Sequence, residues 1–494
     1  MIFDVEVAVV GAGPTGLLLA GDLAQAGVSC AVFERHPHRS DLTRAFAVHA
    51  RTLEQLDARG VADRLVASGT PVAGLRLFAD AKLDLSDLPS RFPYLLVTPQ
   101  YETERTLEER AKPLGAEIRY DSEVTGLVQQ PDGVELTVRE RGRPARVVRA
   151  GYVVGADGMH STVRQAVGMP FPGKPVVRSV MLADVRLSQP PPHVLTVNTT
   201  GQAFAIIAPF GDGWYRVVAW HRHHQPPEQS PVSIDEVADV TRQALGADYG
   251  MHDARWMARF HSEERQVPRY RQGRVLLAGD AAHVHSPAGG QGMNTGLQDA
   301  ANLGWKLAAT VHGWAPPGLL DTYHAERHPV GRRVLRGSGA LLRIALTGPP
   351  FLVSARNLVA RAATETPFIA HRLAGAISGV SISYPAARDA HPLTGKRVGD
   401  LPLADGRRLY EALRDGRFLL ATSPGTVSST AMSGYSDRVE LVTTARAADA
   451  IMLVRPDAYV AWAADATADQ TSTAQIRSAL SRCCGSPARL QSVV

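Results

Sequence analysis

Three glycines near the N-terminus have the spacing of a phosphate-binding turn. Gly11, Gly13 and Gly16 directly follow an apolar run in the pattern G-x-G-x-x-G. The first glycine of this pattern permits a tight turn, the second lets a pyrophosphate approach the backbone, and the third lets a helix pack closely on its strand. An acidic residue, Glu34, follows at the distance where such turns place a ribose-binding carboxylate. These residues predict a dinucleotide site.

The elements that must position these residues are a strand, a helix and a second strand. The segment VEVAVVGAGPTGLLLAGDLAQAGVSCAVFERHP predicts a strand over residues 5–10, the glycine turn, a helix, and a second strand that ends at Glu34. The start of the helix adds free N–H groups and a positive dipole end, and both favour phosphate. This βαβ unit predicts an ADP-containing cofactor and leaves NAD and FAD open. A glycine-rich turn in another α/β protein is the structural alternative.

Two later segments favour FAD. The segment RAGYVVGADGMHSTVRQAVG is an apolar strand that ends at Asp157, before a helix that Ser161 can cap. The segment AGDAAHVHSPAGGQGMNTGLQDAANLGWKL follows another apolar strand, and its Asp280 can hold ribityl or ribose hydroxyls. Both segments therefore place a carboxylate at the end of a predicted strand.

The loop of the second segment is almost free of side chains. It contains Pro287, Gly289, Gly290 and Gly292, and a helix is expected to begin near Met293. A reduced flavin carries negative charge over N1 and O2 of its ring, which a helix N-terminus stabilises without a cation. We therefore predict that the flat isoalloxazine ring lies against this loop. A loop that serves only packing is the alternative.

Together, GAGPTG, GADGMHSTVR and the segment from 278 to 307 resemble the FAD-dependent aromatic hydroxylases. These are single-component flavoprotein monooxygenases that include para-hydroxybenzoate hydroxylase and phenol hydroxylase. The stretches RAFAVHARTLEQLDARG and LLDTYHAERHPVGRRVL are similar to one subgroup, the aromatic polyketide hydroxylases and rifampicin monooxygenases. The resemblance covers most of the chain.

The resemblance implies a role for individual residues. Arg44 would reach the pyrophosphate, Gln100 would lie beside the flavin, and Val124 would lie near the adenine. Met293 and Asn294 would offer backbone N–H groups to the flavin O2 edge. The complete set of implied cofactor-binding residues is Gly11, Gly13, Pro14, Thr15, Gly16, Glu34, Arg35, Arg44, Gln100, Val124, Asp157, Gly279, Asp280, Pro287, Gly290, Gly292, Met293 and Asn294.

The implied fold class is α/β, in three domains. A Rossmann-like FAD-binding domain of the para-hydroxybenzoate hydroxylase type would carry an inserted β-sheet substrate domain, and a thioredoxin-like domain would follow. The expected ranges are 1–75, 98–176 and 268–388 for FAD binding, 76–97 and 177–267 for the substrate sheet, and 389–494 for the C-terminal domain. The C-terminal range has no C-x-x-C motif, so no redox role is expected for it.

The resemblance implies an aromatic substrate and two further reactants. NADPH, or NADH, would bind transiently and reduce the flavin, and O2 would then form a C4a-hydroperoxide that an electron-rich ring attacks. Candidates for the substrate pocket are Phe46, Phe210, Trp214, Pro287 and Gly289, although ordinary core packing explains the aromatic residues equally well. No catalytic side chain can be named, because the chemistry belongs to the cofactor.

Other reactions of the same cofactor stay open. A flavin hydroperoxide could also insert oxygen beside a ketone (a Baeyer–Villiger reaction) or hydroxylate an antibiotic and so inactivate it. An FAD-dependent reductase that adds no oxygen and a flavin-binding protein without activity are further alternatives. We therefore expect hydroxylation of a polycyclic polyketide, in antibiotic biosynthesis, as the first hypothesis.

Composition excludes several other classes of protein. Among 494 residues, Lys and Arg number 53 and Asp and Glu 48, and no basic block suggests nucleic acid. The three cysteines lack the spacing of a metal site, and the histidines of WHRHHQPP are expected in a solvated loop, so no metal is predicted. No apolar run has transmembrane length, and a cytoplasmic protein is expected. A homodimer is compatible with the sequence, although no segment has the pattern of an interface.

Overall fold

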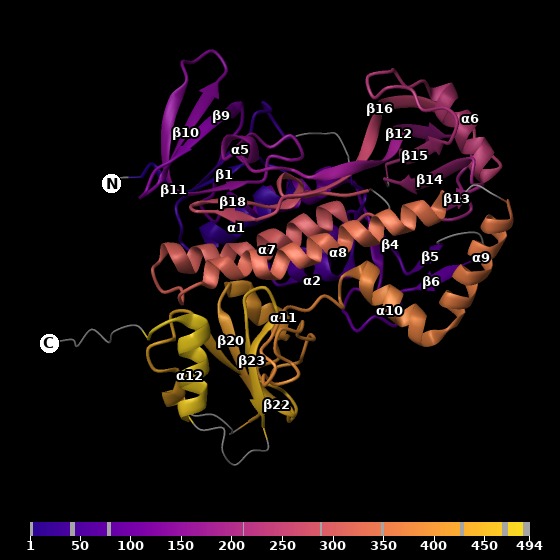
Figure 1. Ribbon diagram of the computed structural model, residues 1–494. Helices are drawn as coiled ribbons and strands as arrows, with labels where there is room; N and C mark the ends of the chain where they lie inside the picture. Colours follow the sequence, from indigo (N-terminus) through magenta and orange to yellow (C-terminus); the bar gives the residue numbers. More distant parts are fainter. Residues whose placement is uncertain are drawn as a thin grey trace.

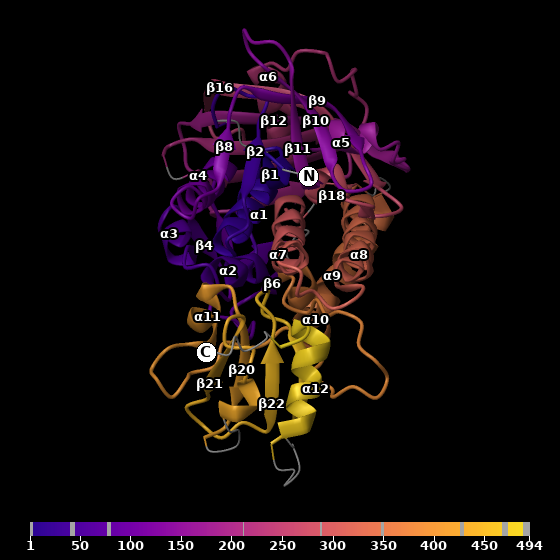
Figure 2. The same ribbon diagram turned by 90° about the vertical axis from the view of Figure 1, so that its left-hand side faces the viewer.

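The computed structural model describes residues 3–39, 45–76, 81–210, 212–286, 289–346, 350–424, 429–466 and 473–487. Two large sheets form the upper part of the molecule in Figure 1, and the C-terminal domain, in orange to yellow, lies below the long helices α7 and α8. Figure 2 shows the same order from the side. The two helices therefore separate the sheets from the C-terminal domain.

The first large sheet has parallel strands at its centre. Its strand order is β17-β18-β11-β1-β2-β8, and β1 lies parallel to both β11 and β2. The antiparallel strands β9 and β10 extend it from β11. The strands are β1 (Val5–Val10), β2 (Cys30–Phe33), β8 (Glu117–Arg119), β9 (Ser122–Gln129), β10 (Val134–Glu140), β11 (Arg146–Gly155), β17 (Arg271–Gln272) and β18 (Val275–Leu277).

Helices pack on this sheet and on one another. Helix α1 contacts both α4 and α7. Pro14 occupies the first turn of α1, where its missing N–H costs no hydrogen bond. The helices of this part are α1 (Pro14–Gln25), α2 (Ala50–Asp57), α3 (Ala62–Ala67), α4 (Gln100–Ala111), α5 (Thr162–Ala166), α7 (Gly292–Val311), α8 (Thr322–Ala345), α9 (Pro350–Glu365) and α10 (Pro367–Ser378).

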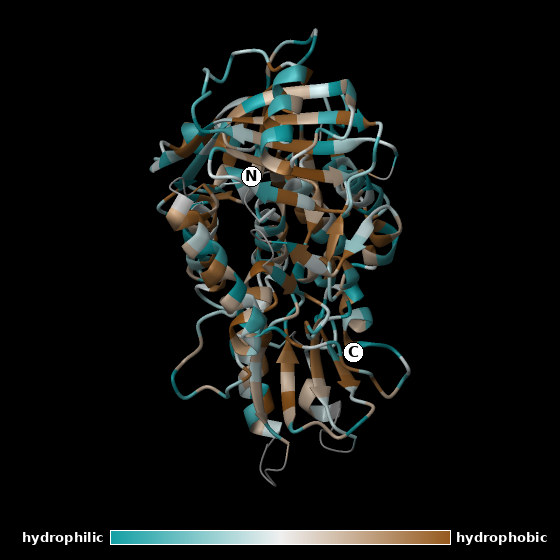
Figure 3. Ribbon diagram, turned by 90° about the vertical axis from the view of Figure 1, so that its right-hand side faces the viewer, coloured by the Kyte–Doolittle hydropathy of each residue, from teal (hydrophilic) through white to brown (hydrophobic). Residues whose placement is uncertain are grey.

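The second large sheet is antiparallel, with the strand order β13-β14-β15-β12-β16-β19. Side chains alternate between its faces. One face packs on α6, and the other joins an apolar cluster that includes Phe46 from the FAD side. Figure 3 shows the matching alternation of colours along the strands. The elements are β12 (Gly173–Leu187), β13 (Thr196–Thr199), β14 (Ala203–Pro209), β15 (Tyr215–His221), β16 (Met251–Gln266), β19 (His283–Val284) and α6 (Ile234–Leu245).

The strands that lie in residues 76–97 do not extend the second large sheet. Strand β6 (Lys82–Asp84) pairs with β5 (Gly74–Arg76). Strand β7 (Leu95–Val97) lies between β3 (Ala47–Val48) and β4 (Thr70–Val72). Apolar residues of both small sheets share one cluster with Leu195, which directly precedes β13, and the domain boundaries stay a prediction.

The C-terminal domain has a sheet in the order β21-β20-β22-β23. Strands β20 and β21 are parallel, whereas the other pairs are antiparallel. Apolar side chains of β20 and of α12 share one core cluster, which Trp305 of α7 joins. The elements are α11 (Leu409–Ala412), β20 (Phe418–Thr422), β21 (Val439–Thr443), β22 (Ala450–Val454), β23 (Val460–Asp465) and α12 (Thr473–Cys484).

Candidate functional site

The three glycines of the N-terminal turn differ in what surrounds them. A Cβ atom on Gly11, where φ is +103°, would collide with the backbone of Ala156, and one on Gly16 would collide with the carbonyl oxygen of Gly11. A Cβ atom on Gly13 would meet nothing within 4 Å. Gly11 and Gly16 are therefore required by packing, whereas the backbone at Gly13 is open. An open backbone beside the start of α1 fits a pyrophosphate.

Glu34 lies at the edge of this turn and already holds it together. Its Oε2 accepts a hydrogen bond from the backbone N–H of Ala12 at 2.8 Å, and its Oε1 lies 2.5 Å from His36 Nδ1. Its side chain is 14% exposed, so an oxygen can still receive a ribose hydroxyl. The neighbouring Arg35 is exposed, whereas Val124 is buried in the core of the same sheet.

Asp157 lies two residues beyond the end of strand β11, and one of its carboxylate oxygens has no partner among the described residues. Its Oδ2 accepts from the backbone N–H of Val163 at 3.2 Å, while its buried Oδ1 has no partner among the described residues. Burial raises the pKa of this carboxyl above its usual value. A buried acceptor without a donor is costly, and a hydroxyl of a bound cofactor would relieve that cost. This atom fits the predicted contact with FAD.

The starts of α1 and α7 meet at Thr15. A Cβ atom on Gly279 would lie 2.8 Å from Thr15 Oγ1, and one on Gly296 would lie closer still. Gly279 follows strand β18 and lies against Thr15 of α1 and Gly296 of α7, and the exposed Asp280 comes directly after it. The arrangement gathers backbone N–H groups and positive dipole ends at one place, which suits an anionic ligand.

His49 and Asn294 hold the glycine loop in front of α7. His49 Nε2 lies 2.8 Å from the carbonyl oxygen of Gly289 and must donate, because a carbonyl only accepts. The Asn294 side chain accepts from the His49 backbone N–H and donates to the carbonyl oxygens of Ala47 and Gly290. Burial lowers the pKa of His49 to about 4, so its ring is neutral at neutral pH.

Sequence reasoning missed His49. The only local signal is its position directly before the buried helix α2, where it is the N-cap residue. Gln100, by contrast, was predicted, and its side chain accepts from the Ala45 backbone N–H at 3.0 Å. The predicted residues Arg44 and Pro287 lie outside the described residues. The assignment of cofactor-binding residues stays a prediction.

His283 belongs to a buried cluster of polar and charged side chains that joins β19, α7 and α8. Its Nε2 lies 2.6 Å from Asp299 Oδ2, and Arg327 Nε donates to Asp299 Oδ1 at 2.7 Å. The backbone N–H of Gly279 also donates to Asp299, at 3.2 Å. The cluster ties α7, α8 and the end of β18 together, which is a positioning role. His285 packs on Gly292, and burial lowers its pKa.

The structure places the predicted pocket aromatics in two groups. Phe46 lies against the apolar face of the second large sheet. Phe210 and Trp214 close the β14–β15 hairpin, with a backbone hydrogen bond of 2.9 Å between them. The guanidinium of Arg255 lies over both hairpin rings, at 5.4 and 4.9 Å from their centroids. Phe46 therefore contacts the apolar face of this sheet, whereas Phe210 and Trp214 lie at its β14–β15 hairpin end.

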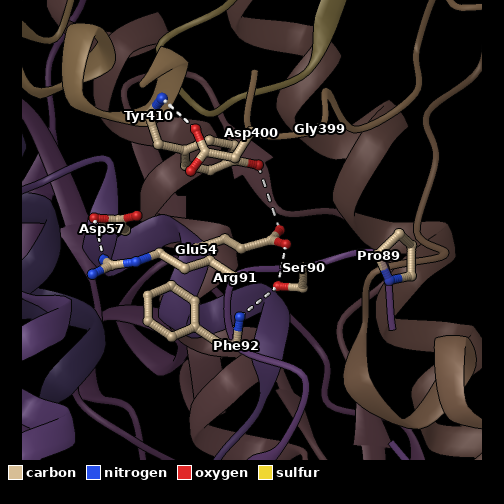
Figure 4. Close-up of a pocket in the computed structure, with 9 residues that line it drawn as sticks. All are labelled: Glu54, Asp57, Pro89, Ser90, Arg91, Phe92, Gly399, Asp400 and Tyr410. Atoms are coloured by element: carbon tan, nitrogen blue, oxygen red, sulfur yellow. Dashed lines mark hydrogen bonds and ion pairs between the residues drawn. The ribbon is translucent and has the colours of Figure 1, made fainter. Parts of the chain in front are cut away.

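A cavity of 270 Å³ lies elsewhere, between α2 and the C-terminal domain (Figure 4). Its carboxylates are paired: Glu54 binds Arg51 and Arg397, and Asp57 binds Arg408. The cavity therefore lies in an interface of ion pairs between α2 and the C-terminal domain, and it is not the predicted cofactor site. Within the described ranges, no cluster of potential metal ligands was found, and none of the helices has the length and apolarity to cross a membrane.

Comparisons with known proteins cover nearly the whole chain. Residues 4–338 match a family model described as "FAD binding domain", and residues 391–487 match "Aromatic-ring hydroxylase, C-terminal". Rifampicin monooxygenase of Streptomyces venezuelae is 41% identical, over 93% of this chain and 96% of its own length. The 12-dehydrotetracycline 5-monooxygenase/anhydrotetracycline 6-monooxygenase of Streptomyces rimosus is 39% identical, over 99% of this chain and 100% of its own length.

A solved structure with the same architecture is OxyS anhydrotetracycline hydroxylase from Streptomyces rimosus. Its TM-score is 0.87 at 39% identity, over 98% of this chain and 100% of the other. The similarity therefore includes both large sheets and the C-terminal domain in one arrangement.

Proposed function

This chain belongs to the family of FAD-dependent aromatic hydroxylases, and on that premise we propose that it hydroxylates a polycyclic aromatic polyketide with NADPH and O2. Family membership confirms the predicted fold class, the FAD cofactor and the monooxygenase class. The observation that carries the substrate proposal is the 39% identity, over both whole chains, to an enzyme named for two tetracycline intermediates.

The residues of this chain fit FAD. We assign the pyrophosphate to the open backbone at Gly13, a ribose to Glu34, and a cofactor hydroxyl to Asp157 Oδ1. The glycine loop, held by His49 and Asn294, offers a flat surface to the ring. When bound and reduced, flavin activates O2 and supplies an electrophilic oxygen atom. The protein orients the substrate ring against that surface and excludes water.

The test starts with the purified protein and its visible spectrum. NADPH and O2 consumption are then followed with tetracyclic and angular polyketide phenols, and products are weighed by mass spectrometry. We expect bound flavin, matched consumption of NADPH and O2 with one class of compound, and a product heavier by one oxygen. Oxidation of NADPH without oxygen incorporation into any compound would favour a reductase.

Inactivation of an antibiotic is a second candidate, supported by the 41% identity to a rifampicin monooxygenase. Including rifampicin in the same panel, with a growth assay on the product, separates this role from biosynthesis. A ring-inserted oxygen in the product would instead indicate a Baeyer–Villiger reaction. A homodimer and a cytoplasmic location also stay proposals; light scattering of the purified protein tests the first, and cell fractionation tests the second.

A further inference from the structure

The positive charge of this chain is concentrated in one segment. Residues 327–388 contain nine arginines, no lysine and one acidic residue, Glu365, so their formal charge is +8. The whole chain has a formal charge of only +5, and the remainder is therefore net acidic. At most two of these arginines are adjacent, so they form no basic block in the sequence. The exposed ones are Arg332, Arg333, Arg336, Arg343, Arg361, Arg372 and Arg388.

Helix α9, within this segment, exposes its apolar side. Its outward residues include Phe351, Leu358 and Val359, whereas Arg356 is turned inward and is only 9% exposed. Arg356 Nη1 donates to the carbonyl oxygen of Ala345, the last residue of α8, at 2.9 Å. A surface helix of a globular protein normally turns its apolar side chains to the core and its charges to water. In α9 the largest apolar side chains face the solvent instead.

Helix α10 continues this surface. It follows α9 after Thr366 and contacts it, and Figure 1 shows α9 at the right-hand edge of the molecule. Large apolar side chains on the two helices are between 42% and 72% exposed, and we call them the apolar patch: Phe351, Leu352, Leu358, Val359, Phe368 and Ile369. Soluble monomers rarely expose so many large apolar side chains on neighbouring helices, and such a surface indicates a partner.

The inner side of α10 borders the predicted cofactor site. Leu373 and Ile377 pack in the apolar cluster that includes Phe46. The side chain of Gln291, the N-cap residue of α7, donates to the carbonyl oxygen of Ile377 at 3.4 Å. Helix α10 therefore touches the glycine loop with one side and carries part of the apolar patch on the other.

Charge distinguishes between the partners that could cover the apolar patch. The Arg372 guanidinium lies 5.3 Å from the centroid of the Phe368 ring, so a cation lies within the patch. Glu365, the one acidic residue of the segment, is paired with Arg361 at 2.7 Å. A second copy of this chain would bring the same cations against these, and like charges oppose that contact. An anionic lipid surface offers phosphates to arginines and acyl chains to apolar side chains in adjacent layers.

We propose that the apolar patch binds the surface of an anionic lipid bilayer. Helix α9 lies along the surface, Phe351 and Phe368 enter the boundary between headgroups and acyl chains, and Arg343 and Arg372 pair with lipid phosphates. Binding of this kind is peripheral and reversible. Because α10 also touches the glycine loop, the bound enzyme holds its predicted active site close to the lipid. The proposal goes beyond the proposed hydroxylation and does not depend on it.

The experiment measures binding of the purified full-length protein to sedimented vesicles. One set of vesicles is phosphatidylcholine alone, and the other contains about one third phosphatidylglycerol, which is anionic. We expect binding to the anionic vesicles to be about tenfold tighter or more. Raising the salt concentration from about 0.1 M to about 1 M should weaken it markedly, because salt screens the arginines, whereas an exclusively apolar contact would not weaken.

Variants then separate the two kinds of contact. For the double variant Phe351→Ser and Phe368→Ser we expect about tenfold to a hundredfold weaker binding to the anionic vesicles. Arg343→Gln with Arg372→Gln should reduce the preference for anionic lipid about tenfold. The matched apolar control is Val128→Ser, on the first large sheet outside the patch, where a side chain of 59% exposure is removed and no change is expected.

Arg242→Gln, on α6, is the matched charge control, and it should bind as the parent does. Flavin content and melting temperature show whether each variant is folded. The comparison of the two kinds of vesicle needs no variant, so it decides even if a variant fails to fold.

Three results overturn the proposal. The first is a parent protein that binds neither kind of vesicle, or both equally well. The second is a Phe351→Ser and Phe368→Ser variant that binds anionic vesicles as tightly as the parent. The third is a dimer in light scattering that this variant dissociates, because the apolar patch would then be an interface between two copies of the chain. Since no turnover is measured, a failure to hydroxylate any compound leaves the lipid result standing.

Discussion

Two buried arginines define two different regions of this molecule. Arg327, where α8 meets α7, and Arg216, on the second large sheet, are both 0% exposed. Every nitrogen of Arg327 has an acceptor, on Asp299, Tyr384 and Thr295. Among the described residues, Arg216 has an acceptor for Nε alone, on Asp184.

The two arginines indicate different roles for the α7–α8 junction and for the second large sheet. Burial opposes the charge of Arg327, but Tyr384 and Asp299 outweigh burial and raise its pKa, whereas burial prevails at Arg216 and lowers its pKa. At the junction of α7 and α8, protein acceptors match every nitrogen of Arg327, and these hydrogen bonds fix the start of α7. The sheet face is incomplete by itself and fits a partner from outside. A buried arginine whose donors all have hydrogen-bond acceptors stabilises the fold, whereas one with unpaired donors indicates a ligand site.

The same contrast separates two glycines, and here we expect the largest effect. Gly16→Ala forces a Cβ atom into the Gly11 carbonyl oxygen, so the N-terminal turn cannot form and little folded protein is expected. Gly13→Ala has room, so its melting temperature should stay within a few degrees of the parent. Its affinity for FAD should fall about tenfold or more, because the methyl occupies the space assigned to pyrophosphate. Thermal melts and FAD titration of the apoprotein measure both.

Equal FAD affinity of Gly13→Ala and the parent would contradict the assignment of the pyrophosphate to that backbone.

The two arginines give the second test. Arg327→Gln leaves Asp299 buried with a weakened set of partners, and we expect a loss of about 3–5 kcal/mol in the free energy of unfolding. Arg216→Gln should lose roughly 1–2 kcal/mol, because Asp184 loses the hydrogen bond from Arg216 Nε but keeps Arg255, and the Nη donors had no partners among the described residues. Urea unfolding of both FAD-loaded variants measures the difference. Equal losses would mean that Arg216 is as structural as Arg327.

His49 predicts a pH dependence at the glycine loop. Its pKa is about 4 in the folded protein and about 6.5 when unfolded, so the unfolded chain takes up a proton first as pH falls. The contribution of neutral His49 to the free energy of unfolding is complete above pH ~6.5. It decreases progressively as the pH falls to ~4, by up to about 3 kcal/mol in all. Urea unfolding at several pH values should show a shallower acid loss for His49→Asn than for the parent.

The smallest effect is expected at the surface. Arg242 pairs with Asp239 and Asp248, but its side chain is 52% exposed. Exposed ion pairs contribute little, so Arg242→Gln should change the free energy of unfolding by less than about 1 kcal/mol. This value sets the baseline for the buried arginines. A larger change in the same urea series would show that charge removal alone, without burial, explains part of the other losses.

The sequence by itself determined the local geometry of the cofactor domain. The spacing of Gly11, Gly13 and Gly16, the acid at Glu34 and a helix start near Met293, observed at Gly292, follow from short stretches, because a strand, a tight turn and a helix fix the positions of neighbouring residues. The family resemblance, carried by three such stretches, supplied the fold class, which the comparisons confirm. Two predicted contacts, at Arg44 and Pro287, lie outside the described residues.

Only the tertiary structure decided which distant residues meet. His49 binds the Gly289 carbonyl 240 positions away, and Arg216 meets Asp184 across a strand pair 32 positions apart. Sequence reasoning named none of these three side chains as site residues. The physical reason is register: a shift of one residue in strand pairing would turn Arg216 to the α6 face, and no local pattern fixes that choice. Which buried donors are matched therefore depends on the packed sheet and helices as a whole.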